Sequence, residues 1–405
     1  MDCQESGECM EPFITFDISK GALTWRLLKN KFLTIITLGI YRFWGKTHVR
    51  RMFWHSIKVG GERLQYHGTG MELFLGFLIA IAILTGVFFV FGLVFGLLSV
   101  MNQTFAVVTQ LANFLMLYAF WQFAYFRLWR YRLSRTSLRT IRFYLTGKGM
   151  TYMGRALMWS AITLLTLGWA YPKLVQVRAD YLMNNVCYGD QSFSYKGNAG
   201  ELMKMYWPAI LVLQLAYGVM FYQFFAMGIY DPEVISGNQE AVDELVQDKG
   251  LLITTSSIFM TAFVVGTLLF LWARVKTFVY ITNNTTLSGA RFFSNLSVGK
   301  VFLILFVTVL VSALIIGAYF GLIALVVSGA ASEEFIGIAM IGFFIFVFLF
   351  MDILMFLFVL VPLFRAAATS ISTDNPAVFE EVAVSSRTSP KYGEGLADAL
   401  DVGAF

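Results

Sequence analysis

One stretch of the chain, Thr37–Leu73, recurs between long apolar segments. A gapless alignment that places Gly60 on Gly189 also sets its Thr-Leu-Gly start on a second Thr-Leu-Gly at 166–168. Two less exact gapless alignments place Trp44 on Trp272 and Gly68 on Gly147. A missed internal repeat gives the wrong fold, so the repeat is interpreted before any helix is assigned. Since apolar runs flank the copies, we interpret them as modules that join membrane-spanning helices.

The composition agrees with a membrane protein. Of 405 residues, 58% are hydrophobic and only 14% are charged, about half the charge of a typical soluble domain. Cys3, Cys9 and Cys187 are an odd number without a close pair, which indicates neither a disulfide framework nor a zinc site. The first residues lack the basic and apolar regions of a secretory signal peptide, so we expect them to be retained.

Hydropathy and the repeat together divide the chain into five parts. We expect an N-terminal cytoplasmic segment at 1–20, a first membrane repeat at 21–150, a second membrane repeat at 151–300, a C-terminal transmembrane hairpin at 301–364 and a C-terminal cytoplasmic tail at 365–405. The apolar segments at about 21–41 and 156–171 fall short of the roughly 20 residues that a span needs. The predicted fold is therefore an all-α polytopic membrane protein with six full spans plus two short re-entrant or interfacial helices. Eight full spans are the alternative.

Charge predicts the orientation. The four modules are rich in Lys and Arg, whereas the segment 230–250 is acidic and the turn at 332–334 has no basic residue. Basic short loops face the cytoplasm. With six spans, all four modules and the C-terminus share the cytoplasmic side; eight spans would put two of the modules outside.

Three motifs resemble a known family. They are TLGIYRFWGKTHVRR, GERLQYHGTGMEL and LADALDVGAF, which occur in this order. With them the chain resembles the YjgN family of bacterial inner-membrane proteins, a group defined by a domain of unknown function. The resemblance implies residence in the bacterial inner membrane and implies no activity or catalytic residue. The second copy departs from the pattern, because it has Lys173 where the first has Trp44.

Two glycine turns are candidates for binding an anion. Gly68-Thr69-Gly70 and Gly147-Lys148-Gly149 each precede a predicted helix, and free N–H groups at a helix N-terminus attract anions. With the basic residues near them, they suit a lipid headgroup or a small anion. The candidate residues are Arg63, Gly68, Gly70, Arg142, Gly147, Lys148 and Gly149. The alternative is that these glycines only let the chain turn into the membrane.

Asp352 is the candidate functional acid. It lies inside the apolar run FFIFVFLFMDILMFLFVLVPLF, where a central carboxylate costs about 2.5 to 3.5 kcal/mol on insertion scales. We expect it to face the protein interior, with a polar residue of another helix as its partner. A role in transport and a purely structural hydrogen bond both remain open.

Other chemistry receives little support. His48, His55 and His67 lack the spacing of a metal site, so no metal or cofactor is expected. Basic residues interleaved with aromatics, as in 127–132, are explained by anionic membrane lipids, so lipids and not nucleic acids are the expected partners. We recognise no nucleophile or acid–base pair and expect no enzyme. The leading hypothesis is a transporter or channel-like protein for a small solute or ion; the alternative is a non-transporting scaffold or anionic-lipid-binding protein.

Overall fold

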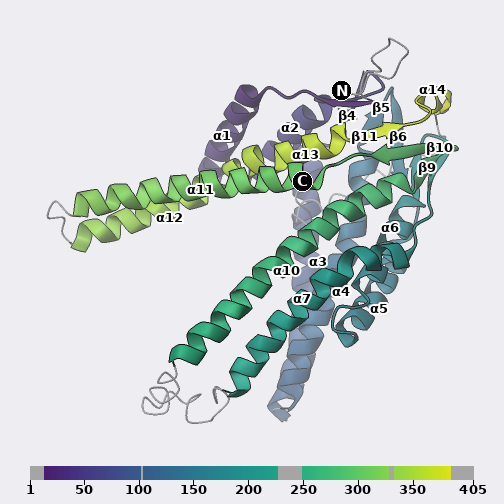
Figure 1. Ribbon diagram of the computed structural model, residues 1–405. Coiled ribbons are helices and arrows are strands. Elements are labelled where there is room, and N and C mark those ends of the chain that lie inside the picture. Colours follow the sequence, from purple (N-terminus) through teal and green to yellow (C-terminus); the bar gives the residue numbers. More distant parts are fainter. Residues whose placement is uncertain (1–12, 102–103, 227–248, 328–332, 385–405) are drawn as a thin grey trace. The chain divides into compact units, whose positions relative to one another are not determined.

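The computed structural model describes residues 13–101, 104–226, 249–327 and 333–384 (Figure 1). The chain forms two compact units: residues 1–154, 181–195 and 282–405 make the first, and residues 155–180 and 196–281 make the second. Each unit is described by itself. Most of the acidic segment 230–250 and the end of the expected C-terminal tail lie outside the described residues.

Long apolar helices dominate the fold. Among the described residues, six helices are long and apolar enough to cross a membrane. They are α3 (Gly70–Met101), α4 (Thr104–Ser134), α7 (Ala199–Ala226), α10 (Lys249–Asn283), α11 (Val298–Val327) and the last arm, which joins α12 (Glu333–Met355), the π-helix η1 (Phe356–Leu360) and α13 (Val361–Thr369). The predicted helical membrane fold with six candidate spans is confirmed.

Two pairs of short helices are each joined by a Thr-Leu-Gly turn of the same geometry. α1 (Lys20–Ile36) and α5 (Gly149–Leu165) each have 17 residues, or about 26 Å, less than the ~30 Å of a bilayer core. Each ends at its Thr-Leu-Gly turn, after which α2 (Arg42–His55) and α6 (Tyr171–Met183) follow. In both turns the leucine and the glycine have positive φ, at 49° and 93° in the first and 51° and 99° in the second. The glycine N–H bonds back to a threonine carbonyl at 2.7 Å in both, which ends the helix.

The β-structure is more extensive than the sequence indicated. The first strand is β1 (Ile14–Phe16). β1 pairs with β2 (Ile57–Val59), which pairs with β3 (Glu62–Arg63). A second, eight-stranded antiparallel sheet contains β4 (Gln65–Tyr66), β5 (Thr136–Leu138), β6 (Ile141–Leu145), β7 (Val186–Tyr188), β8 (Gln191–Tyr195), β9 (Thr285–Leu287), β10 (Ala290–Ser294) and β11 (Ile371–Thr373). Strands this short, lying between long apolar helices, give too little alternation to be recognised.

The order of the large sheet constrains the membrane topology. Its strands follow chain order from β4 to β11, and every neighbouring pair is antiparallel. In such a sheet, successive connections leave from opposite ends of the strands. Tight turns join β5 to β6, β7 to β8 and β9 to β10, so the helical connections all leave from the other end. Because one hydrogen-bonded sheet holds hairpins from the second, third and fourth modules and β4 from the first, these modules have to share one side of any membrane that the helices cross.

The hairpins recur at the positions that the sequence alignments pair. β2 begins at Ile57, and β5, β7 and β9 begin at Thr136, Val186 and Thr285, the residues on which the three alignments place Ile57. Asn184 accepts a hydrogen bond from the N–H of Tyr195 at 2.6 Å. In the same way, Asn283 and Ser294 form the equivalent bond at 2.8 Å. These asparagines close the third and fourth hairpins alike.

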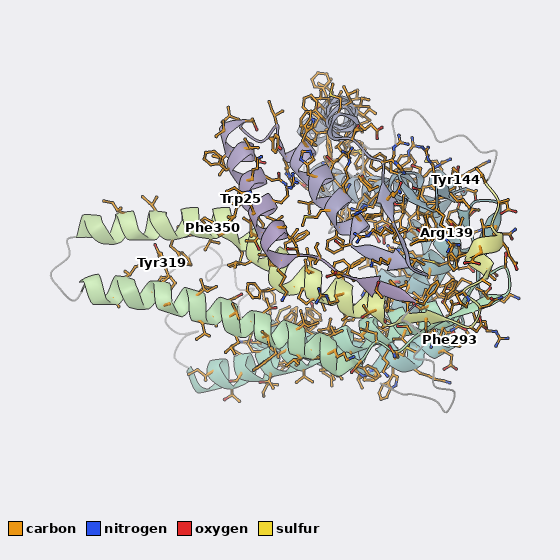
Figure 2. All side chains as sticks on the ribbon, turned by 90° about the horizontal axis from the view of Figure 1, so that it is seen from above. Trp25, Arg139, Tyr144, Phe293, Tyr319 and Phe350 are labelled. Atoms are coloured by element: carbon orange, nitrogen blue, oxygen red, sulfur yellow. The ribbon has the colours of Figure 1, made fainter. Side chains whose placement is uncertain are left out.

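A C-terminal segment completes the core of the sheet. α14 (Val378–Glu381) buries Val378 and Phe379 against Tyr188 and Leu287. Arg139, which lies at the β5–β6 turn and is labelled in Figure 2, pairs with Glu380 at 3.2 Å. Part of the segment expected as a tail therefore packs on the sheet.

Candidate functional site

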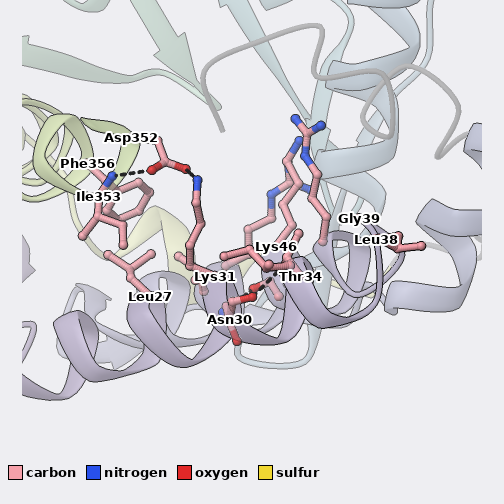
Figure 3. Close-up of a pocket in the computed structure, with 15 residues that line it drawn as sticks. Leu27, Asn30, Lys31, Thr34, Leu38, Gly39, Lys46, Asp352, Ile353 and Phe356 are labelled. Atoms are coloured by element: carbon pink, nitrogen blue, oxygen red, sulfur yellow. Dashed lines mark hydrogen bonds and ion pairs between the residues drawn. The ribbon is translucent and has the colours of Figure 1, made fainter. Parts of the chain in front are cut away.

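A cavity lies in the first unit, between α1, α2 and the end of α12 (Figure 3). Its volume is about 670 Å³, within the range of ligand pockets. The polar side chains around it are those of Asn30, Lys31, Thr34, Arg42, Lys46, Arg50 and Asp352, and the apolar ones are those of Leu27, Ile35, Leu38, Val49, Ile353 and Phe356.

One wall is a close contact between α1 and α2. The buried Asn30 side chain donates to the carbonyl of Gly45 at 3.0 Å. A Cβ on Gly45 would lie 3.2 Å from the Cβ of Asn30, so even alanine there would require Asn30 to shift by a few tenths of an ångström. Leu23, farther back on α1, is fully buried in a cluster with Phe53 of α2. The contact therefore holds the two short helices as a pair and orients their basic residues.

The opposite wall is an ion pair between residues far apart in the chain. The Lys31 ammonium donates to Asp352 Oδ2 at 2.7 Å, and Asp352 Oδ1 accepts from the N–H of Ile353 at 3.0 Å. Figure 3 shows Lys31 reaching from α1 to Asp352 on α12. The Asp352 side chain is 63% exposed, so its carboxylate remains accessible from the cavity.

A break in helical geometry follows Asp352. Residues Phe356–Leu360 form a π-helix, and Pro362 is the second residue after it. Proline has no N–H, so the carbonyl of Phe358 loses its α-helical donor. Thr308 of α11 donates its hydroxyl to that carbonyl at 3.1 Å. Such π-segments often occur at functional sites, and this one begins at Phe356 in the wall of the cavity.

The lining is strongly cationic. Four basic side chains line the cavity together with one carboxylate, that of Asp352. Arg50 is nearly fully buried and donates to the Tyr66 hydroxyl at 3.4 Å, which anchors its guanidinium. Lys and Arg side chains of this kind donate to phosphate and carboxylate groups.

The equivalent hairpin at the start of the second repeat lacks these charges. In the alignment that places Gly60 on Gly189, Lys31, Arg42, Lys46 and Arg50 correspond to Ser160, Tyr171, Val175 and Ala179. Asn30 corresponds to Trp159, whose ring lies under the Lys173 ammonium at 5.7 Å. Because the second hairpin forms the same turn without the four cations, the fold of the hairpin does not require them.

The surroundings of Asp352 differ in part from those expected. Its partner is Lys31 of α1, so it pairs with a polar residue of another helix, as expected. It lies at an exposed position on the cavity wall and not within a packed interior. The available signal for this pairing was a basic residue in the apolar segment 21–41 and a single acid in the apolar run around Asp352. The pairing of Lys31 with Asp352 was missed because Lys31 belongs to a helix that is too short to span a membrane.

The first glycine turn serves packing. A Cβ on Gly68 would lie 2.5 Å from the Tyr66 hydroxyl, and a Cβ on Gly70 would lie 2.7 Å from Trp44. Thr69 caps the start of α3 by accepting from the Glu72 N–H at 3.3 Å. The Glu72 carboxylate, in the first turn of α3, pairs with Arg135 at 3.0 Å. These groups occupy the site where an anion was expected.

The second turn is closed in a similar way. The N–H of Lys148 donates to the Tyr181 hydroxyl at 2.8 Å, and that hydroxyl donates to the Lys148 carbonyl. Cβ atoms on Gly147 and Gly149 would lie 2.9 Å from the rings of Tyr181 and Phe123. These contacts favour the interpretation that the glycines allow the chain to turn.

The two arginines expected beside the turns lie on strands. Arg63, on β3, donates to the carbonyl of His55 at 3.2 Å. Arg142 lies on β6. Neither belongs to the lining of the cavity between α1, α2 and α12.

The histidines occupy different surroundings. His67 Nε2 lies 2.7 Å from the Ser137 hydroxyl. The pKa of His48 is lowered by burial and, next, by the positive charges of Arg26, Arg51 and Lys29. Within the described residues, no three His, Cys, Asp or Glu side chains are grouped as a metal site would require.

Comparison with known proteins identifies a family without a known activity. A family described as bacterial protein of unknown function, DUF898, matches residues 13–398. No curated protein and no solved structure matches the chain.

Proposed function

The chain belongs to the DUF898 family of bacterial proteins, and from its own geometry we propose that it binds an anionic lipid in the cavity between α1, α2 and α12. The observation that carries this proposal is four basic side chains beside an apolar lining, in a hairpin whose equivalent in the second repeat lacks them. We propose a binding role and not a catalytic one.

The depth of the cavity supports a lipid headgroup as the ligand. α12 begins at Glu333 and contains Asp352 near its end, with no charged residue between Glu334 and Asp352. At a rise of ~1.5 Å per residue, the helix from Glu333 to Asp352 is about 28 Å long, close to the thickness of a bilayer core. If α12 enters at one surface, Asp352 and Lys31 lie at the headgroup level of the other.

The apolar surface around the cavity supports an amphiphilic ligand. Leu38, at the tip of the α1–α2 hairpin, is 94% exposed and also lines the cavity. Trp25, labelled in Figure 2, and Phe32 are exposed on α1. Residues of this kind lie stably in the membrane interface. Acyl chains could therefore follow apolar surface away from the basic residues.

The orientation follows from charge. We propose that the sheet and the four modules face the cytoplasm of the bacterial inner membrane, because the modules are basic and the segment 230–250 is acidic. Anionic lipids of the cytoplasmic leaflet would then be next to the cavity. The recurrence of the hairpins at the aligned positions supports an origin by internal duplication.

Transport of a small solute or ion is the second candidate. It is favoured by the Lys31–Asp352 pair, which lies beside a π-helix at a cavity wall. Ion pairs in such places mark pathways in many transporters. Proton- or anion-driven flux in liposomes, abolished by Asp352→Asn, would support this candidate.

Binding of the lipid can be measured directly. Purified protein is titrated with phosphatidylglycerol, with phosphatidylcholine of the same acyl chains and with soluble glycerol phosphate, and bound lipid is counted by native mass spectrometry. We expect preference for phosphatidylglycerol. Since a basic residue near anionic lipid contributes about 1 kcal/mol, Lys46→Gln should weaken binding about fivefold.

Lys204→Gln is the matched control. Lys204 is an exposed lysine near the start of α7, and the change removes the same charge away from the cavity. Equal weakening by both variants would show general attraction to a basic surface and would overturn the cavity assignment. Equal binding of glycerol phosphate would identify a soluble anion and not a lipid as the ligand.

A further inference from the structure

We propose that Asp352 determines the headgroup charge that the cavity accepts, so that it binds phosphodiester lipids with one negative charge in preference to phosphomonoester lipids with nearly two. This inference rests on the proposed function and specifies its ligand.

The Asp352 carboxylate lies where a bound anion would meet it. Asp352 Oδ2 is 2.7 Å from the Lys31 ammonium, so any anion that uses Lys31 must lie close to Asp352. Because the side chain is 63% exposed and lines the cavity, the bound headgroup would meet the carboxylate directly.

Phosphomonoester and phosphodiester headgroups differ in their negative charge. A phosphomonoester has a charge of about −1.5 to −2 at pH 7, whereas a phosphodiester has only one. The additional charge would be repelled by Asp352 at a distance of a few ångströms, where water screens the interaction incompletely. Placing a like charge against an unwanted ligand is a general means of specificity.

The remaining lining explains why a single charge is still accepted. Arg42, Lys46 and Arg50 supply positive charge in addition to Lys31. Asp352 pairs with Lys31, and the other three basic side chains lie elsewhere in the lining. Asp352 therefore limits the charge of the ligand without excluding anions.

The substitution Asp352→Asn tests this role with little change of shape. The asparagine amide oxygen can still accept from the N–H of Ile353, so the local helix contact is preserved while the charge is removed. Glu201→Gln is the control, because it removes an exposed carboxylate at the start of α7.

The measurement is a competition between phosphatidylglycerol and phosphatidic acid of identical acyl chains, followed by native mass spectrometry. In the wild type we expect phosphatidylglycerol to bind more tightly. In Asp352→Asn the preference should shift toward phosphatidic acid by about three- to tenfold, which corresponds to the loss of one nearby repulsive charge. Asp352→Glu should restore the wild-type preference, and Glu201→Gln should not alter it.

The other outcomes separate this inference from the proposed function. An unchanged preference in Asp352→Asn, or equal weakening of both lipids, overturns this inference and leaves lipid binding in place. If the wild type binds neither lipid, the proposed function itself fails. Should Asp352→Asn not fold, Lys31→Gln replaces it: leaving Asp352 without its ion-pair partner should increase discrimination against phosphatidic acid, and an unchanged preference would overturn the inference.

Discussion

Thr308 donates its hydroxyl to the main-chain carbonyl of Phe358 at 3.1 Å, one helical turn before Pro362. The same hydroxyl also lies 2.8 Å from the Ile304 carbonyl of its own helix. The contact links α11 to the π-helix that follows Asp352, at the point where proline leaves a carbonyl without its α-helical donor. It therefore stabilises the wall of the proposed lipid site from α11.

Thr308→Val should destabilise the protein. Valine keeps the shape of the side chain and removes the donor, and the loss of a typical buried hydrogen bond costs about 1 kcal/mol. Thr267→Val is the control, because the exposed Thr267 hydroxyl donates to Phe263 of its own helix. Thermal unfolding in detergent should give a lower Tm for Thr308→Val than for Thr267→Val. Equal Tm values would contradict a stabilising link between the two arms.

A pair of glycine variants measures the packing of the C-terminal segment. Gly60 and Gly189 both have positive φ, at 54° and 56°, so alanine brings similar backbone strain at either position. A Cβ on Gly189 would collide with the Ala383 carbonyl, whereas a Cβ on Gly60 has nothing within 4 Å. Gly189→Ala should therefore lower Tm clearly more than Gly60→Ala. Similar losses would mean that the C-terminal segment does not pack on the sheet in solution.

The lowered pKa of His48 predicts that the folded protein becomes less stable as the pH decreases. Burial and neighbouring positive charges lower its pKa below the ordinary value of 6.5, so the unfolded chain binds more protons than the folded one as the pH decreases. The stability that the neutral His48 contributes is complete above pH 6.5. It is lost progressively as the pH decreases from 6.5 toward the lowered pKa of His48 in the folded protein. We expect the Tm of the wild type to decrease between about pH 8 and about pH 5.5 more than that of His48→Gln. Parallel curves would show that His48 does not contribute.

The topology is tested by labelling single cysteines. In a variant without Cys3, Cys9 and Cys187, a cysteine is introduced at Ser192, which is exposed on β8, or at Ser236 in the acidic segment. In intact cells, a membrane-impermeant reagent should label Ser236→Cys and not Ser192→Cys. External labelling of Ser192→Cys would place the sheet outside and would contradict the cytoplasmic orientation.

The long apolar runs were sufficient to predict the helical membrane fold. Hydrocarbon cannot satisfy polar backbone groups, so a run of about 20 apolar residues has to form a helix. The short lengths of the segments that became α1 and α5 likewise favoured six spans over eight. Asp352 also stood out in the sequence alone, because a charge within an apolar run is costly.

The sheet and the cavity depended on tertiary structure. The strands are short, and their hydrogen-bond partners come from modules far away in sequence, so no local pattern predicts the pairing. Lys31 and Asp352 lie near opposite ends of the chain, and only the packing of α1 against α12 brings them together. The sequence by itself determined which segments are apolar enough to enter a membrane, because apolar length is a local property. Only the tertiary structure decided which charged residues form an ion pair, because an ion pair depends on distance in space.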